Sequence, residues 1–204
     1  DGPPDWSFVD RRAEVRIKYA ETHSDPSWFD ADGDGDLDLF ITSIYPNCGS
    51  FLYRNTGRGR FEDITWLAGV RSFNGWGCAV SDYDLDGDLD LVVGSGSGLR
   101  LFRNDGPARA AERNHYISVV AIGTDSNRSG IGARVSVTGE LGTQIREIGG
   151  GKGTTSQHSL AAFLGMGSDD GPVDIEVSFI GGRAVVLNGV RVDQRIVVRE
   201  SEAQ

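Results

Sequence analysis

Two nine-residue stretches with five aspartates each constrain this chain more than any other feature. They are DADGDGDLD at residues 30–38 and DYDLDGDLD at residues 82–90. Carboxylates crowded this closely repel one another unless a cation lies among them. Ca²⁺ takes six to eight oxygens, and its binding loops commonly supply carboxylates at positions 1, 3 and 5 and a backbone carbonyl at position 7. Both stretches have this spacing, so the sequence predicts two Ca²⁺ sites.

Each loop also has glycine at position 6, Gly35 and Gly87, where the chain must turn sharply. A solvated acidic turn is the simpler interpretation of one such loop, but two copies with the same spacing and the same glycine count against it. Mg²⁺ fits less well, because it prefers few carboxylates and several waters. The predicted ligands are Asp30, Asp32, Asp34 and Asp38 with the carbonyl of Asp36, and Asp82, Asp84, Asp86 and Asp90 with the carbonyl of Asp88.

The loops are not EF-hands. Position 12 is Ile41 in the first loop and Val93 in the second, where an EF-hand has glutamate. The residues that follow alternate with period two and are rich in β-branched and apolar side chains, which is typical of a strand. We therefore expect each loop to open directly into a strand that carries the aspartate of position 9.

The loops belong to a longer internal repeat, because Asp30 and Asp82 lie 52 residues apart. Downstream, LYRNTG at 52–57 recurs as LFRNDG at 101–106, and upstream FVD at 8–10 recurs as FED at 61–63. These units resemble the FG-GAP (VCBS-type) repeats of integrin-like β-propellers. The resemblance implies two calcium-binding, blade-like repeats within residues 1–107, at about 5–57 and 58–107.

From residue 114 onward the aspartate loops stop and the pattern becomes that of a second all-β unit. Residues 108–113 are rich in Ala and Arg and are expected to form a linker. Seven alternating segments separated by Gly-rich turns predict a small β-sandwich-like domain over 114–200, and no long helix is evident. The predicted strands are 116–123, 133–139, 144–148, 161–164, 174–180, 184–187 and 195–199.

Three motifs in this second half carry a further resemblance. They are SNRSGIGARV at 126–135, GKG at 151–153 and FLGMG at 163–167. This part resembles the ASPIC/UnbV domain of the cartilage acidic protein family, whose members join FG-GAP repeats to this domain in the same order. A Trp-Pro-x-Gly turn common in that family is replaced here by FIGG at 179–182.

The run from Asn127 to Arg134 has two interpretations. Its glycines and arginines could bind an anion or a carbohydrate. Alternatively it is a structural turn in which Gly130 and Gly132 adopt positive φ and the arginines pair with nearby aspartates. We favour the turn, and keep carbohydrate as a candidate ligand.

No catalytic or cofactor-binding residue is predicted. GGGKG at 149–153 lacks the spacing of a phosphate-binding loop and is expected to be a mobile hairpin turn. His158 lies near Ser156 and Ser159, but no Gly-x-Ser-x-Gly elbow accompanies them. We expect the four tryptophans to pack in the core. They are Trp6, Trp28, Trp66 and Trp76.

Composition excludes several classes of partner. The net charge of −10 argues against nucleic acid and anionic membrane surfaces, and no apolar run is long enough to insert into a membrane. The chain begins at Asp1, so an export signal could have been removed before it. A disulfide between Cys48 and Cys78 is possible. A zinc site is not expected, because the chain has no further Cys or spaced His pair to complete it.

We therefore expect a secreted, extracellular or cell-surface calcium-binding protein. Its role would be binding, adhesion or self-assembly, with structural Ca²⁺. The alternative, which the ASPIC/UnbV resemblance makes conceivable, is an accessory or tailoring protein in natural-product biosynthesis, with an enzymatic role as an open option. Propellers close with about four to eight blades, so two repeats leave open edges. We expect another protein or a second copy of this chain to cover them.

Overall fold

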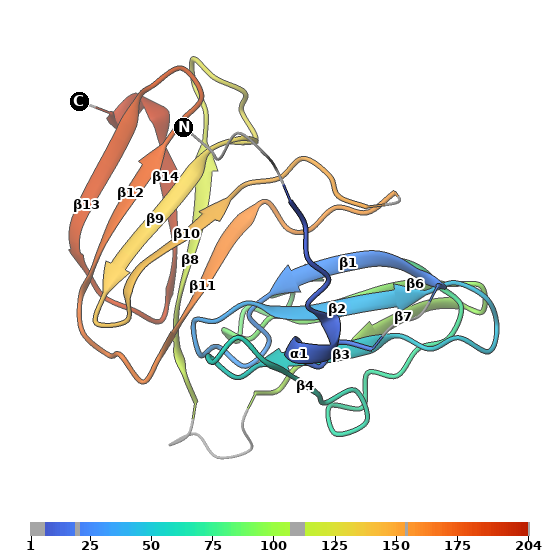
Figure 1. Ribbon diagram of the computed structural model, residues 1–204. Coiled ribbons are helices and arrows are strands. Elements are labelled where there is room, and N and C mark those ends of the chain that lie inside the picture. Colours follow the sequence, from blue (N-terminus) through green and yellow to red (C-terminus); the bar gives the residue numbers. More distant parts are fainter. Residues whose placement is uncertain (1–6, 19–20, 107–112, 154, 204) are drawn as a thin grey trace.

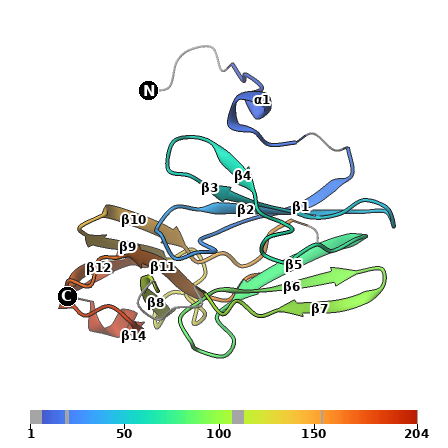
Figure 2. The same cartoon turned by 90° about the horizontal axis from the view of Figure 1, so that it is seen from below.

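The first half of the chain forms two antiparallel sheets that lie one above the other (Figures 1 and 2). The computed structural model describes residues 7–18, 21–106, 113–153 and 155–203. Each aspartate loop joins the first two strands of its sheet, as predicted from the alternation that follows it. The first sheet has the order β1 (His23–Phe29), β2 (Asp38–Ser43), β3 (Phe51–Asn55), β4 (Phe61–Asp63), and the second has the order β5 (Gly75–Ser81), β6 (Asp90–Ser95), β7 (Gly98–Phe102).

Apolar side chains fill the space between these two sheets. Phe40 and Leu52 of the first sheet belong to the same buried cluster as Leu91 and Val93 of the second. Because side chains alternate along a strand, the neighbours of these residues point to the opposite face. On that outer face of the first sheet, Leu39, Ile41 and Tyr53 form a separate cluster, which is covered by Ile17 after the short helix α1 (Arg12–Val15).

The second half is a sandwich of two sheets, called the C-terminal sandwich below (Figure 1). Its core is a single cluster of alternating aliphatic residues from both sheets. Each of the seven predicted strands overlaps one observed strand, so the all-β class is confirmed. One sheet has the order β10 (Gly142–Glu147), β9 (Arg134–Gly139), β12 (Val173–Ser178), β13 (Ala184–Val190), and the other has β11 (Ala161–Gly167), β8 (His115–Ile122), β14 (Gln194–Arg199), with η2 (Glu200–Glu202) last.

Several predictions meet a different outcome. Strand β4, at the start of the expected second repeat, pairs with β3 and so lies in the first sheet. The linker 108–113 lies almost wholly outside the described residues. Three tryptophans are surface residues rather than core residues, namely Trp28, Trp66 and Trp76, and Trp6 is outside the described part of the chain.

The C-terminal sandwich packs directly on the two sheets of the first half. Phe163 of β11 joins the cluster between those sheets, and its ring stacks on that of Tyr116 at 5.4 Å between centroids. Beyond the sandwich, residues 149–153 and 155–159 extend over the first half (Figure 1). There the Ser159 N–H donates to the Val80 carbonyl at 3.0 Å. The two halves therefore share one interface and part of one core.

The GGGKG segment is not the free hairpin turn that the sequence suggested. Lys152 Nζ lies 2.9 Å from Asp25 Oδ2, and Asp25 is completely buried. Beside this pair, Cys78 is buried and unpaired, with its sulfur 2.8 Å from the Ser27 hydroxyl. Cys48 is also a free thiol, so the disulfide left open by the sequence is not formed.

Candidate metal centres

Each aspartate loop is closed by the aspartate of position 9. Asp38 accepts the N–H of Ala31 at 2.8 Å and that of Asn55 at 2.7 Å, one on each carboxylate oxygen. In the second loop Asp90 accepts the N–H of Tyr83 at 3.0 Å and that of Asn104 at 2.8 Å in the same way. The position-9 carboxylate thus ties the start of its loop to the third strand of its sheet.

The two asparagines explain why Arg-Asn-x-Gly recurs with the loops. The Asn55 side chain donates to the Leu37 carbonyl and accepts the Gly57 N–H. Asn104 repeats both contacts with Leu89 and Gly106. It also donates to the Ala31 carbonyl of the first loop at 2.8 Å. Sequence reasoning noticed the recurrence but did not assign these residues to the site.

The glycines at position 6 adopt the conformation that the loop requires. Gly35 has φ 96° and Gly87 has φ 95°, a region open to glycine and costly for other residues. At position 4 the chain also has positive φ, at Gly33 in the first loop and at Leu85 in the second. Both loops therefore share one backbone path despite their different sequences.

Each loop brings three of its four predicted side-chain ligands together. In the first, carboxylate oxygens of Asp30, Asp32 and Asp38 lie within 4.8 Å of one another, and in the second those of Asp82, Asp84 and Asp86 do so. Asp34 lies outside the first group, with Oδ1 accepting the Asp36 N–H, and Asp90 lies outside the second.

The side chains at position 7 point away from these groups. A Cβ on Gly57 would lie 3.0 Å from Asp36 Oδ2, and one on Gly106 would lie 2.5 Å from Asp88 Oδ2. Each carboxylate is therefore directed at the Asn-x-Gly turn. This orientation is compatible with the prediction that position 7 contributes only its carbonyl.

The first group has the electrostatics of a site that needs a cation. Asp30 is 2% exposed. Asp30 Oδ1 and Asp32 Oδ1 are buried and have no hydrogen-bond partner among the described residues. Burial, reinforced by the neighbouring carboxylates, raises the pKa of both Asp30 and Asp38 to about 7. Leaving a buried oxygen without a partner costs about 1–3 kcal/mol, and more if it is charged. A hard cation fits this set of donors, because it would bind the unpartnered oxygens.

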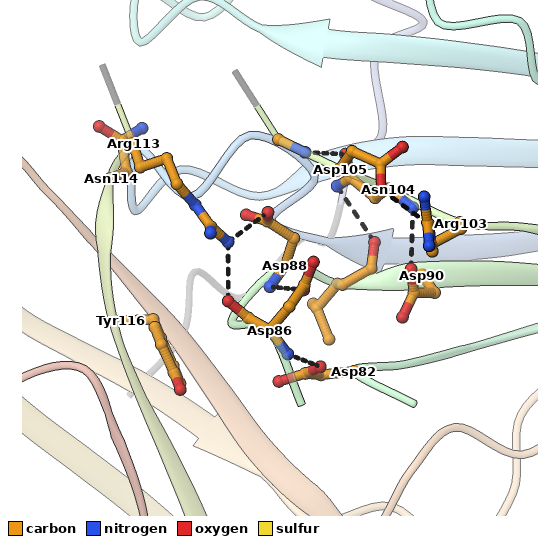
Figure 3. Close-up of polar contacts among 12 residues, drawn as sticks. Asp82, Asp86, Asp88, Asp90, Arg103, Asn104, Asp105, Arg113, Asn114 and Tyr116 are labelled. Carbon is orange, nitrogen blue, oxygen red and sulfur yellow. Dashed lines mark hydrogen bonds and ion pairs between the residues drawn. The ribbon is translucent and has the colours of Figure 1, made fainter. Parts of the chain in front are cut away.

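The second group is more open and is partly compensated by an arginine (Figure 3). Arg113 Nη2 lies 2.7 Å from the Asp86 carbonyl and 2.8 Å from Asp88 Oδ2. Burial still raises the pKa of Asp82 and Asp88 above the ordinary value. The two centres are therefore not equivalent, and the first has the greater need of a cation.

Both loops lie against the C-terminal sandwich. At the first loop, the Gly167 N–H donates to the Gly33 carbonyl at 2.9 Å, and Asn114 Nδ2 donates to the Asp32 carbonyl at 2.8 Å. At the second, a Cβ on Gly87 would stand 2.4 Å from the Tyr116 ring. The FLGMG motif thus supplies the surface on which the first loop rests.

Comparison with known proteins agrees with this arrangement. An FG-GAP-like repeat matches residues 30–93, which include both aspartate loops, and an ASPIC and UnbV domain matches residues 123–204. The chain is thus similar to an FG-GAP-like repeat in its first half and to an ASPIC/UnbV domain in its second half. Both resemblances drawn from the sequence are confirmed. The ASPIC/UnbV match covers the C-terminal sandwich from the residue after β8 onward, so this sandwich is called the ASPIC/UnbV domain below.

Two similar curated proteins are distant relatives. Cartilage acidic protein 1 of Homo sapiens is 28% identical over 174 residues, covering 78% of this chain and 25% of the relative. Cartilage acidic protein 1 of Xenopus tropicalis is 29% identical over 162 residues, covering 76% and 25%. The chain thus spans about a quarter of the length of these curated relatives. Within its described residues, none of the helices has the length and apolar character needed to cross a membrane.

A small cavity lies where the ASPIC/UnbV domain meets the two sheets. Its volume is about 180 Å³, and Trp28, Arg146 and His158 help to line it. Ligand pockets are usually about 300–1,000 Å³. Burial beside Lys152 lowers the pKa of His158 to about 4, and its Nδ1 accepts the Val80 N–H at 3.0 Å. His158 is thus a neutral residue that holds the segment 155–159 on β5.

The Asn127–Arg134 run forms the predicted turn, with Gly130 at φ 65° and Gly132 at φ 84°. The arginines of this run were expected to pair with nearby aspartates. The ion pair found next to the turn instead joins Asp125 to Arg183, an arginine from outside the run. Glu200 Oε2 accepts the backbone N–H groups of residues 124, 125 and 126 at 2.7–2.9 Å. These donors, which could hold an external anion, are therefore occupied by a carboxylate of the ASPIC/UnbV domain itself.

Proposed function

We propose that this chain is an extracellular binding module in which two structural Ca²⁺ ions hold the FG-GAP sheets against the ASPIC/UnbV domain. The observation that carries the proposal is the pair of buried, unpartnered oxygens on Asp30 and Asp32. They lie in a loop that the ASPIC/UnbV domain covers through Gly167 and Asn114. A cation there would neutralise the loop at the place where the two domains meet.

The donor set favours Ca²⁺ over other metals. All side chains in both groups are carboxylates, which select hard cations over zinc or copper. The predicted carbonyl of position 7 adds a further oxygen, and the irregular arrangement suits the flexible coordination of Ca²⁺ better than the strict octahedron of Mg²⁺. Arg113 beside the second group reduces its net negative charge, so we expect tighter binding at the first site.

The proposed role of the ions is structural. In both loops the carboxylates anchor backbone N–H groups of the same loop, which fixes the loop in the conformation that contacts Asn114 or Tyr116. Calcium would remove the repulsion among these carboxylates and so stabilise the contact. Loops of extracellular modules bind with dissociation constants of about 10⁻⁴–10⁻³ M, which matches calcium concentrations outside cells.

Secretion and a binding role follow as parts of the same proposal. They rest on the combined FG-GAP-like and ASPIC/UnbV organisation and on the similarity to cartilage acidic protein 1. Exposed aromatic side chains such as Trp66, at 75% exposure, offer contact area to a protein partner. The module would present these surfaces while calcium keeps its two domains together.

Calcium titration followed by thermal melting tests the proposal. A ligand that binds only the folded state raises the melting temperature as its concentration increases. We expect this increase for the unmodified chain, a smaller one for Asp32→Asn and for Asp84→Asn, and an unchanged one for Asp170→Asn. Asp170 is exposed and lies outside both loops, so it is the matched control. Equal melting curves in calcium and in EDTA, with no heat of calcium binding, would show that the metal proposal is wrong.

A further inference from the structure

The cavity between the ASPIC/UnbV domain and the two sheets has walls from both parts of the chain. Phe29 and Asp30 line it from the first sheet and its loop, Val80 lines it from β5, and Arg146 and Phe163 line it from the ASPIC/UnbV domain. Its volume of about 180 Å³ is room for roughly six non-hydrogen atoms, because one water molecule takes about 30 Å³ in the liquid. Domain interfaces are preferred places for ligand sites. The cavity is too small for a cofactor and large enough for one functional group on a short carbon chain.

Most charged side chains that line this cavity are already compensated. Lys152 forms its ion pair with the buried Asp25. His158 is neutral, because burial and the nearby Lys152 lower its pKa to about 4. Asp30 accepts an N–H of its own loop on Oδ2, and its Oδ1 belongs to the proposed cation site. Glu147 is exposed to solvent. The remaining charged group is an arginine.

Arg146 lacks an anionic partner. It is half-buried on β10, and burial of the guanidinium lowers the pKa of Arg146 below its ordinary value. Its hydrogen bonds go to neutral oxygens, from Nη2 to Gln144 Oε1 at 3.2 Å and from Nη1 to the Ile145 carbonyl at 3.0 Å. Within the described residues, no carboxylate forms an ion pair with it and its Nε–H has no acceptor. A half-buried cation in this state gains from an anionic partner.

The guanidinium is held in place from the side of the ASPIC/UnbV domain. Gln144, whose Oε1 accepts from Arg146, donates from Nε2 to the Gly165 carbonyl at 2.7 Å. Gln144 thus connects Arg146 to the FLGMG motif, on which the first aspartate loop rests. A donor group fixed in this way loses less conformational freedom when a ligand binds.

The one carboxylate that acts on Arg146 does so from a distance. Asp30 attracts the guanidinium without an ion pair. A cation bound at Asp30 would cancel this attraction, because the carboxylate charge would then be neutralised. Both ends of the cavity would be positive, and only an anion could balance them.

We propose that this cavity binds the carboxylate group of a small ligand, with Arg146 as the residue that recognises it. The planar guanidinium fork matches the two oxygens of a carboxylate. Phe29, Leu37 and Phe163 supply apolar walls for the attached carbon chain. Trp28, which also lines the cavity, is 50% exposed and extends this wall to the surface. Phosphate or sulfate fits less well, because its additional oxygens would face these apolar walls without donors.

Two sources of this carboxylate fit the volume. One is the side chain of a glutamate on a protein partner, and the other is a free short acid such as propionate. Both present the same group on a short apolar chain. The inference goes beyond the structural role of calcium, since Arg146 and the cavity are present without the ion.

An NMR titration of the full chain in calcium tests the proposal. The signals to follow are the backbone amides of residues 146–149 and the indole N–H of Trp28. We expect saturable shifts with propionate and none with propionamide, a neutral molecule of nearly the same shape. Absence of a saturable shift with propionate, or equal shifts with both compounds, overturns the proposal.

Variants of the cavity supply the second measurement. Arg146→Gln should weaken propionate binding at least about tenfold, because a hydrogen bond to a charged group contributes that much. Arg191→Gln is the matched control, since Arg191 is an exposed arginine of the same domain outside the cavity. Ala161→Leu fills the cavity while it leaves Arg146 in place, and it should abolish binding. Unchanged affinity in either folded variant overturns the proposal.

A blocked peptide separates the two sources of the carboxylate. Acetyl-Gly-Glu-Gly-amide carries its only carboxylate on the side chain. Binding at least as tight as that of propionate would assign the site to a protein partner, and binding of propionate alone would assign it to a free acid. Repeating the titration in EDTA isolates the role of the cation. Equal propionate binding in calcium and in EDTA would contradict only the ion at Asp30, whereas a calcium-stabilised chain that binds no propionate would contradict only the carboxylate site.

Discussion

Gly165 lies so close to Asp30 that a Cβ on residue 165 would stand 2.1 Å from Asp30 Oδ2. The same Cβ would also stand 2.6 Å from the backbone of Gly33. One glycine of the FLGMG motif therefore lets the ASPIC/UnbV domain touch the first aspartate loop. The motif and the loop, more than a hundred residues apart in sequence, are parts of one contact.

Gly165→Ala should weaken this contact. The added methyl group would push the first loop away from β11, and overpacking of this kind typically costs about 1–3 kcal/mol. We expect a lower melting temperature and weaker calcium binding at the first site, measured by thermal melting and isothermal titration calorimetry. Gly94→Ala is the control, because a Cβ there meets nothing closer than 3.8 Å. Equal calcium affinities in the two variants would contradict the proposed coupling.

The raised pKa of about 7 for Asp30 and for Asp38 predicts an unusual pH dependence. Between the ordinary Asp value of 3.8 and about 7, the calcium-free folded state binds more protons than the unfolded state. Its stability must therefore fall as pH rises through this window. Calcium competes with these protons, so we expect its stabilising effect to grow over the same range.

Thermal melting in EDTA and in calcium, from about pH 5 to about pH 8, measures both effects. In EDTA the melting temperature should decline with rising pH, and the difference between calcium and EDTA should widen. Asp30→Asn removes one of the titrating groups and should flatten the decline. A calcium-free chain that becomes more stable toward pH 8 would show that these carboxylates are not protonated as inferred.

Local sequence patterns predicted much of the fold and the acidic loops. The period-two alternation after Asp38 and Asp90 gave the strands, and glycine at position 6 gave the turns. Contacts between distant segments were not predictable in the same way. Nothing near Lys152 in sequence shows that it pairs with Asp25, because the partner lies 127 residues away. The expectation of a free turn failed for that reason.

Exposed tryptophans and the placement of β4 illustrate the same limit of single-sequence reasoning. Single-sequence reasoning assigns Trp66 to a core because large aromatic residues are usually buried, yet the turn after β4 places it on the surface. The match between FVD and FED was visible in the sequence. Its meaning depends on which sheet each segment joins, and only the pairing of β4 with β3 shows that.

The buried Lys152–Asp25 pair predicts a strong effect of one substitution. Asp25 is completely buried, and although burial raises its pKa, hydrogen bonds from Lys152, the Cys78 N–H and Ser156 keep it below the ordinary value. Lys152→Met would leave that charge without its partner, which typically costs about 3–5 kcal/mol. Urea denaturation should show the loss.

Two further variants distinguish the loss of this ion pair from the loss of any lysine side chain. Asp25→Asn in the Lys152→Met background should recover part of the stability, because the uncompensated charge is removed, and a double-mutant cycle then gives the coupling between the two residues. Lys18→Met is the matched control, since the Lys18 side chain is 60% exposed in its ion pair with Asp63, whereas the Lys152 side chain is 19% exposed, and an exposed cation should contribute less than about 1 kcal/mol. Equal losses for Lys152→Met and Lys18→Met would contradict the assigned role of the buried pair.

Glu200 predicts a second pH effect, of opposite sign to that of the aspartate loops. Hydrogen bonds from Ser126, Thr124 and Asp125 lower its pKa to about 2 from the ordinary 4.5. Its contribution to stability is therefore complete above pH 4.5 and is lost as pH falls toward 2. Glu200→Gln should lower the melting temperature at neutral pH, and the gap from the unmodified chain should narrow as the solution is acidified. Glu147→Gln, at an exposed position on β10 of the same domain, is the control. A gap of constant size at every pH would mean that Glu200 acts through its shape and not through its charge.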